Sequence, residues 1–164
     1  RPLQLKPGVV RASQRDAMTK ARVPEEYEDE PTAFLTVDLE VYSRRRLARL
    51  AAVLTKRLSL QYEGKHSKGR YFVAFGDGSL YWTSRRRLTT PDQQIVALVR
   101  LIKTLPADAA ALWRGAQSRN FDIGVQCGMR PPHSYQLSLS PKTLAAATSV
   151  NAKIVVTVYA PNRK

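Results

Sequence analysis

Apolar and polar residues alternate along several stretches of the chain, which is the pattern of strands with one buried face. In the first of these, the apolar positions fall on one side, while Thr36, Asp38 and Glu40 fall on the other. Two glycines beside Asp77 separate two aromatic-rich runs, and this spacing predicts a hairpin. The predicted strands span 33–42, 71–75, 80–84, 121–127, 135–139 and 153–159.

Other stretches carry apolar residues at helical spacing. Two of them begin with a hydroxyl residue followed by proline, Thr90-Pro91 and Ser140-Pro141. Such a hydroxyl caps free amide groups, and proline fits the first helical position. Ser43 is expected to cap another helix, with an apolar stripe on its buried side. The predicted helices span about 43–58, 90–105, 107–119 and 140–150.

The order of these elements is β-α-β-β-α-α-β-β-α-β, which predicts an α+β fold. We expect a ferredoxin-like arrangement, with a mainly antiparallel sheet, helices on one face, and an extra C-terminal helix and strand. Residues 32–161 are expected to form this single domain. Residues 1–31 are expected to form an N-terminal tail or arm, because they contain few apolar residues and show no period. The uncovered face of the sheet would be available to partners.

The composition excludes several kinds of site. The 164 residues include one cysteine, Cys127, and two histidines, which excludes an intrachain disulfide and a Cys/His zinc cluster. No apolar run approaches the roughly 20 residues of a membrane-spanning helix. We therefore expect no cofactor, no metal site and no membrane span. We also expect a cytoplasmic location, with which the lack of disulfides is compatible.

Charge is the strongest compositional signal, with a formal net charge of +14. Residues 1–31 hold six basic and six acidic side chains, whereas residues 32–164 hold 21 basic and seven acidic ones. A field of this sign favours acidic partners, such as a nucleic acid or an acidic protein surface. Abundant arginine that only keeps a protein in solution would give the same composition.

The sequence Ser-Arg-Arg-Arg-Leu occurs twice, at 43–47 and 84–88. In the first copy the arginines would occupy the opening turn of a helix, where the dipole disfavours cations and an anion would relieve the conflict. If both runs lie at one edge of the fold, they form a large anion-binding patch; otherwise they are two solvated runs on different faces. The residues expected to contact a partner are Arg44, Arg45, Arg46, Lys65, Lys68, Arg70, Arg85, Arg86 and Arg87.

Candidates for chemistry are few. Asp38 and Glu40 share one strand face and could perform acid–base work, although such pairs more often bind arginine. His66 and His133 lie in predicted loops without a clear orienting carboxylate, and Cys127 is expected to be a buried, inert thiol. We therefore expect no catalytic residues. Five aromatic residues could instead stack on bases if exposed: Tyr71, Phe72, Phe75, Tyr81 and Trp82.

Several short motifs resemble a family of small bacterial domains of unknown function. The matching segments are Tyr81-Trp82-Thr83-Ser84, the helix carrying Ile95, Leu98 and Ile102, the segment 139–144, and Val156-Thr157-Val158-Tyr159. The resemblance covers roughly residues 32–161 and implies the fold and a bacterial source. The chain departs from the family in its basic charge and in lacking a Gly-x-x-Pro-Thr element after the first helix. Some such domains neighbour toxin or defence genes, which suggests an immunity role.

These observations together favour a non-enzymatic, basic binding protein. Our leading hypothesis is that it docks an acidic macromolecular partner, as an immunity or inhibitor protein of a bacterial toxin or defence system does. The alternative is a DNA- or RNA-binding protein that uses the two arginine runs on phosphates. The motifs of nucleotide-binding loops, serine hydrolases and zinc proteases do not occur in the sequence.

Overall fold

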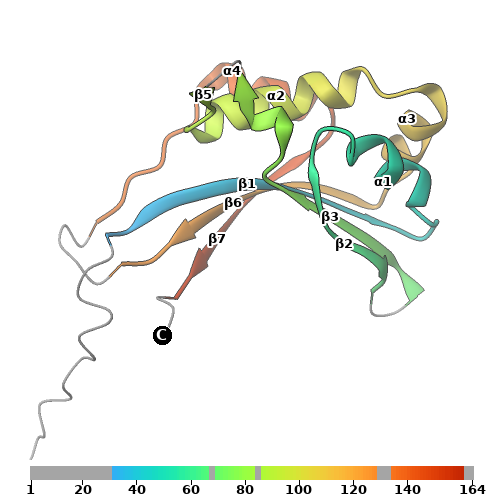
Figure 1. The fold of residues 1–164 in the computed structure, drawn as a ribbon, viewed down its shortest axis with the longest axis horizontal. Helices are drawn as coiled ribbons and strands as arrows, with labels where there is room; N and C mark the ends of the chain where they lie inside the picture. The colour runs from blue at the N-terminus through green and yellow to red at the C-terminus, as the bar shows by residue number, and fades with distance from the viewer. Residues whose placement is uncertain (1–30, 67–68, 84–85, 129–133, 161–164) are drawn as a thin grey trace, which may run out of the picture.

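Five strands form one sheet in the order β2-β3-β1-β6-β7 in the computed structural model, which describes residues 31–66, 69–83, 86–128 and 134–160 (Figure 1). The strands are β1 (Ala33–Ser43), β2 (Ser59–Lys65), β3 (Tyr71–Gly76), β6 (Ser118–Gln126) and β7 (Lys153–Tyr159). The β2–β3, β3–β1 and β1–β6 pairs are antiparallel, and the β6–β7 pair is parallel. The predicted α+β class is confirmed, with a sheet that is mixed.

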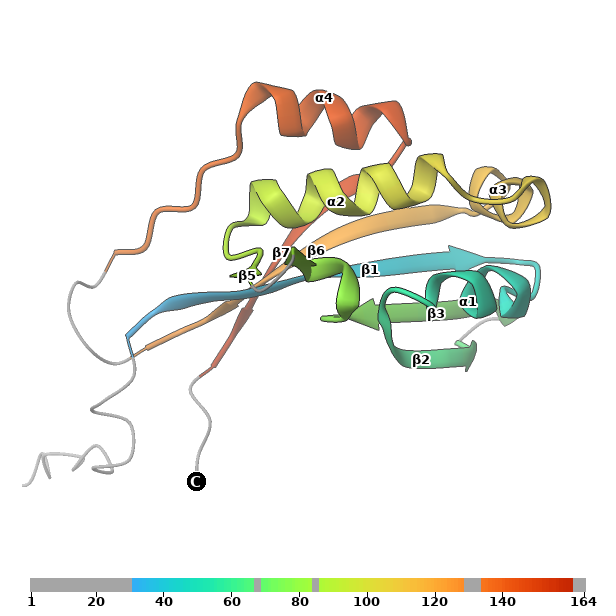
Figure 2. The same cartoon turned by 45° about the horizontal axis from the view of Figure 1, so that its top comes forward.

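Within the described residues, four helices lie on one face of this sheet, and no described element covers the other face, which we call the uncovered face (Figures 1 and 2). They are α1 (Ala48–Leu54), α2 (Pro91–Lys103), α3 (Ala107–Arg114) and α4 (Pro141–Ser149). A short 3-10 turn, η3 (Ser79–Tyr81), leads into a small two-stranded ribbon of β4 (Trp82–Thr83) and β5 (Arg86–Arg87). The core fills the layer between helices and sheet, where side chains such as Leu39, Leu98 and Phe121 are fully buried.

The two predicted hydroxyl–proline helix starts are confirmed. The Thr90 hydroxyl oxygen accepts a hydrogen bond from the Gln93 amide at 3.3 Å, and the Ser140 hydroxyl accepts one from the Thr143 amide at 3.2 Å. Asp92 connects the two starts, because its carboxylate accepts hydrogen bonds from the Ser140 amide and the Thr143 hydroxyl. These hydrogen bonds hold the pKa of Asp92 below its usual value. The first turns of α2 and α4 are therefore fixed to each other.

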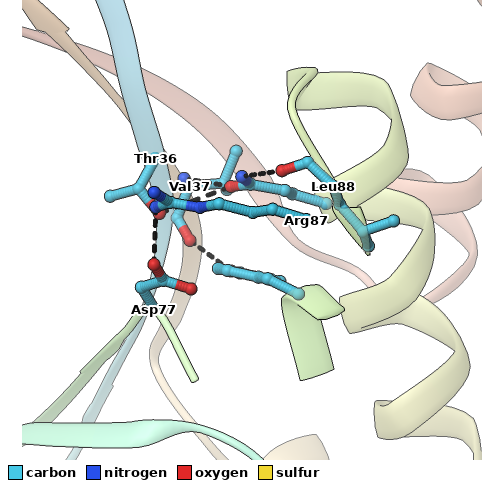
Figure 3. Close-up of polar contacts among 7 residues, drawn as sticks. Thr36, Val37, Asp77, Arg87 and Leu88 are labelled. Atoms are coloured by element: carbon cyan, nitrogen blue, oxygen red, sulfur yellow. Dashed lines mark hydrogen bonds and ion pairs between the residues drawn. The ribbon is translucent and has the colours of Figure 1, made fainter. Parts of the chain in front are cut away.

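A side chain of α2 forms hydrogen bonds with backbone groups at an irregularity of β1 in the sheet (Figure 3). The β1–β6 register shifts between Phe34 and Val37, so the ladder is interrupted there. The side-chain oxygen of the buried Gln94 accepts a hydrogen bond from the Val37 backbone amide at 2.7 Å. The side-chain amide group of Gln94 donates a hydrogen bond to the Leu88 carbonyl at 2.9 Å. The Tyr81 hydroxyl donates to the Val37 carbonyl. Side chains thus satisfy backbone groups that the bulge leaves without a partner.

Three sequence predictions of elements are wrong, and one strand was missed. The first helix begins at Ala48 rather than after Ser43, because β1 continues through Ser43. Residues 71–76 pair with the unpredicted strand β2 instead of forming a hairpin with 80–84. Residues 135–139 form no strand. The predicted tail, residues 1–31, lies outside the described residues except for Pro31.

Candidate functional site

The uncovered face of the sheet carries aromatic side chains at one end. Tyr42 of β1 pairs with Phe72 of β3, and their rings stack with centroids 4.4 Å apart and planes at 23°. The centroids of the Tyr62 and His66 rings each lie 5.6 Å from the centroid of the Phe72 ring. Tyr62 is 44% exposed, and His66 is exposed. We call Tyr42, Tyr62, His66 and Phe72 the aromatic platform.

The path of β2 explains how the aromatic platform is built. Gly64 pairs with Phe72. A Cβ atom on Gly64 would stand 3.0 Å from the Tyr62 hydroxyl, so glycine leaves room for that ring to fold along the strand. The Tyr62 hydroxyl then donates to the Lys65 carbonyl at 3.0 Å. Because these contacts fix the Tyr62 ring before anything binds, little conformational entropy is left to lose on stacking.

Five cations lie at the same end of the sheet as the aromatic platform, and we call Arg44, Arg45, Arg46, Lys65 and Arg70 the basic end. The register sets Lys65 beside Tyr71 on the face that carries the helices. Arg44, Arg45 and Arg46 lie in the turn between β1 and α1, and all three are exposed. The Ser43 hydroxyl accepts a hydrogen bond from the Arg45 amide at 3.0 Å, which shapes this turn. Because α1 starts only at Ala48, the arginines precede the helix, and the expected conflict with its first turn does not arise.

The basic end is rich in positive charge that the described part of the chain does not neutralise. Among the described residues, none of its five members forms an ion pair with a carboxylate. The Arg46 guanidinium donates to the Tyr71 hydroxyl at 3.4 Å and holds the pKa of Tyr71 below its usual value. The Arg70 Nε atom is buried and has no hydrogen-bond partner within the described ranges. The exposed charges of Arg44, Arg45 and Lys65 are therefore available to anionic atoms of a ligand.

The second arginine run does not join the basic end. Arg87 in β5 forms an ion pair with Asp77 at 2.5 Å, at the far end of β3 from Tyr71 (Figure 3). A strand of this length separates the two runs by roughly 20 Å. Arg86 is exposed in the same strand. Arg85 and Lys68, which were also predicted to contact a partner, lie outside the described residues.

Carboxylates gather further along the sheet from the aromatic platform, with Asp38, Glu40 and Asp122 on the uncovered face. Asp38, Glu40, Asp77 and Asp122, which we call the acidic group, are four of the seven carboxylates in residues 32–164. Burial raises the pKa of Asp38 to about 6; a hydrogen bond from Gln61 lowers it, and the other three carboxylates raise it. The Thr157 hydroxyl lies 2.7 and 2.9 Å from the two Asp122 oxygens. The uncovered face is thus divided into a cationic, aromatic end and an anionic region.

The acidic group is not arranged as a metal site in the part of the chain that the structure describes. Within the described residues, no three His, Cys, Asp or Glu side chains are arranged to hold a metal ion. The Asn120 amide donates to Glu40 at 3.1 Å, so this carboxylate is already held by a neighbour. His66 belongs to the aromatic platform, and His133 lies outside the described residues. Cys127, predicted to be buried, is half-exposed because β6 ends at Gln126.

Sequence reasoning identified the cations of the basic end but missed half of the aromatic platform. Of the aromatic residues expected from sequence, Phe75 and Tyr81 are fully buried, and Trp82 lies apart from the platform. Tyr42 and Tyr62 were not candidates. The signal for Tyr62 is a short alternation, in which Leu60 and Tyr62 lie between polar residues. It covers only two apolar positions, and the bulge between them puts the two side chains on different faces of the sheet.

Any assignment of function must rest on the geometry of the site, because comparisons with known proteins find no match. A scan of protein-family models finds no match to the chain, and searches of curated proteins and of solved structures find none either. These comparisons neither support nor refute the resemblance to a bacterial domain family. In the part of the chain that the structure describes, no helix has the length and apolar character needed to cross a membrane.

Proposed function

We propose that this protein is a non-enzymatic binding protein that holds a single-stranded nucleic acid at the aromatic platform and the basic end. The observation that carries the proposal is a cluster of rings on the uncovered face, in which Tyr42 stacks on Phe72 and Tyr62 lies tilted beside it, at the same end of the sheet as cations without an ion-pair partner among the described residues. Bases of single strands stack on such rings, while cations bind the phosphates. A double helix cannot offer its stacked bases to the platform.

The architecture gives this proposal a familiar scaffold. We infer that β1, α1, β2, β3, α2 and β6 constitute a ferredoxin-like core, with α4 and β7 as an addition. The strand order β6-β1-β3-β2, antiparallel throughout, is that of two interleaved β-α-β units and supports the inference. In such a core the two central strands, here β1 and β3, carry the side chains in the middle of the uncovered face. Tyr42 and Phe72 lie on these two central strands, at the end of the uncovered face that carries the basic end.

The acidic group limits where a bound nucleic-acid strand can lie on the sheet. Asp38 is four residues from Tyr42 along β1, about 13 Å away, and Glu40 is closer. Phosphates would be repelled there, so the bound nucleic acid should lie toward Arg44 and Arg70, the latter close enough to Tyr42 to act on its charge, rather than run along β1 toward Asp38. The footprint is then short, about two or three nucleotides.

Fluorescence anisotropy with labelled single-stranded and duplex oligonucleotides tests the proposal. We expect binding of the single strand, weaker binding of the duplex, and a fall in log K with log salt of about −0.7 for each phosphate contacted. Tyr62→Ala should weaken single-strand binding roughly 5- to 150-fold, which is the value of one stacked base. Tyr135→Ala is the matched control, because Tyr135 is 41% exposed outside the site and its removal should leave binding unchanged.

The Tyr62→Ala and Tyr135→Ala variants also distinguish nucleic-acid binding from the leading hypothesis of the sequence analysis, an acidic protein partner. An acidic protein partner, as for an immunity or inhibitor protein, would be captured through the charge of the basic end, and Arg44→Glu with Arg45→Glu would abolish capture. Tyr62→Ala would then matter no more than Tyr135→Ala. If the protein binds no oligonucleotide at low salt, the nucleic-acid proposal is wrong.

A further inference from the structure

The outer edge of β7 offers a row of backbone groups that no described strand pairs with. β7 is the last strand of the sheet order, next to β6 alone (Figure 1). The Tyr159 carbonyl accepts the Cys127 amide at 2.8 Å, so Tyr159 directs its backbone groups toward β6. Because this direction alternates along a strand, Ile154, Val156 and Val158 direct their N–H and C=O groups outward. An added strand would therefore find three residues ready to pair.

The two edges of the sheet differ in how they are protected. The opposite edge, β2, contains a bulge between Leu60 and Tyr62 and carries Glu63 and Lys65, and such features discourage strand addition. β7 pairs with β6 without a register shift, and its only charged residue is Lys153 at its start. Long, regular, apolar edges of this kind recruit further strands.

Two exposed valines lie along the same edge. Val156 is 54% exposed and Val158 is 62% exposed, although both belong to the face of the sheet that carries the helices. α4 packs mainly against α2 rather than over these side chains. A strand added to β7 would bring its own side chains against both valines and remove apolar surface from water.

We propose that this edge pairs with a second copy of the chain, β7 against β7 in antiparallel orientation, with Val156 on the two-fold axis. In this register Val156 faces Val156, and Ile154 faces Val158, so β-branched side chains meet across the pair. The outward-directed residues of two copies supply about six backbone hydrogen bonds. The two sheets become one continuous sheet.

Charge complementarity favours a second copy over a different partner. The register sets Lys153 of one copy opposite Tyr159 of the other, and both side chains belong to the uncovered face. The Tyr159 ring lies beside Gly124. Burial is the largest cause that raises the pKa of Tyr159, and the nearby carboxylates of Asp122, Asp38 and Glu40 add to it. Lys153 therefore approaches the acidic group of its partner copy. The two basic ends lie at opposite ends of the joined sheet, so the net charge of +14 on each copy does not oppose the contact locally.

Sedimentation equilibrium of the full chain, without nucleic acid, tests this inference. The unchanged protein should dimerise, and Val156→Lys should be monomeric because it sets charged side chains against each other on the axis. Leu144→Lys is the matched control, since Leu144 is 47% exposed on α4 and is not part of the β7 edge, and it should dimerise normally. A protein that stays monomeric throughout the micromolar range, or a Val156→Lys variant that still dimerises, would overturn the proposal.

Disulfide trapping tests the register and does not depend on a disrupted variant. In a Cys127→Ser background, Val156→Cys should form an intermolecular disulfide, because paired residues on the axis have Cα atoms about 5.5 Å apart, within disulfide range. Ile154→Cys should not, because four residues of offset separate the two copies by about 13 Å. Equal trapping of both variants would contradict the register. Oligonucleotide binding by Val156→Lys should be unchanged. A failure of the dimer proposal can therefore be distinguished from a failure of the proposed nucleic-acid binding.

Discussion

Replacing Asp38 with asparagine should stabilise the protein at neutral pH and have little effect near pH 4. Burial is the largest cause that raises the pKa of Asp38, from 3.8 to about 6, and the carboxylates of Asp122, Glu40 and Asp77 add to it. The folded state therefore holds the Asp38 proton more tightly than the unfolded state does. The stability that this proton contributes is present below about pH 4 and is lost as the pH rises to about 6. Asparagine is neutral at every pH and can still bond to Gln61.

The size of the effect follows from the pKa difference. A difference of about two pKa units corresponds to about 3 kcal/mol if all of it opposes folding at neutral pH. Asp38 is only partly buried, and solvent screening reduces such a value considerably. We therefore expect Asp38→Asn to raise the free energy of unfolding by about 1 kcal/mol above pH 7.

Urea unfolding at a series of pH values measures this difference. The advantage of Asp38→Asn should grow between about pH 4 and pH 6 and then stay constant. Asp92→Asn is a control with the opposite sign, because hydrogen bonds from Thr143 and Ser140 lower the pKa of Asp92. That variant should be less stable at neutral pH, and its deficit should shrink as the pH falls. A stability difference for Asp38→Asn that does not vary with pH would refute the reasoning.

Two further predictions concern buried polar side chains. Gln94→Leu leaves the Val37 amide and the Leu88 carbonyl without partners, and we expect it to cost about 2–4 kcal/mol in urea unfolding; a cost below about 0.5 kcal/mol would contradict this role. Arg119→Met removes hydrogen bonds to the carbonyls of Trp113, Arg114 and Asn151, and it should cost about 2–3 kcal/mol in thermal unfolding; an unchanged melting temperature would show that these bonds contribute little.

Signals within a few residues predicted the elements that depend on local chemistry. The Thr90 and Ser140 caps act on amides three residues ahead, so the starts of α2 and α4 could be predicted without knowledge of the fold. The alternation of β1 and β6 reflects burial of one face, and both strands lie inside the sheet. The apolar stripe of α1 was also correct, since Leu50, Ala51 and Leu54 are buried.

The elements that depend on distant partners could not be predicted. β2 is an edge strand whose residues are almost all exposed, and its alternation is limited to Leu60 and Tyr62, which is too short a pattern to identify a strand. Gly78, interpreted as part of a hairpin turn, instead allows close packing, since a Cβ atom there would stand 2.7 Å from the Arg57 carbonyl oxygen and the Leu58 Cα atom. The segment 135–139 alternates in sequence but has no neighbouring strand to pair with in the described part of the chain.

The candidate site depends partly on local sequence signals and partly on contacts between distant strands. Its cations could be predicted, because Arg44, Arg45 and Arg46 form a run in the sequence. The aromatic platform could not, because Tyr42, Tyr62 and Phe72 come from three strands, and one of these strands was missed. Only the cross-strand register brings the rings together and sets them beside the arginines.

Chemical-shift mapping with a short single-stranded oligonucleotide tests the proposed function most directly. In two-dimensional NMR spectra at low salt, we expect the largest changes at the rings of Tyr42, Tyr62 and Phe72, with smaller changes at the amides of Arg44–Arg46. The surface of α2 and α4 should be unaffected. Changes confined to the helical face, or an absence of changes in these three rings at saturating oligonucleotide, would contradict the proposal.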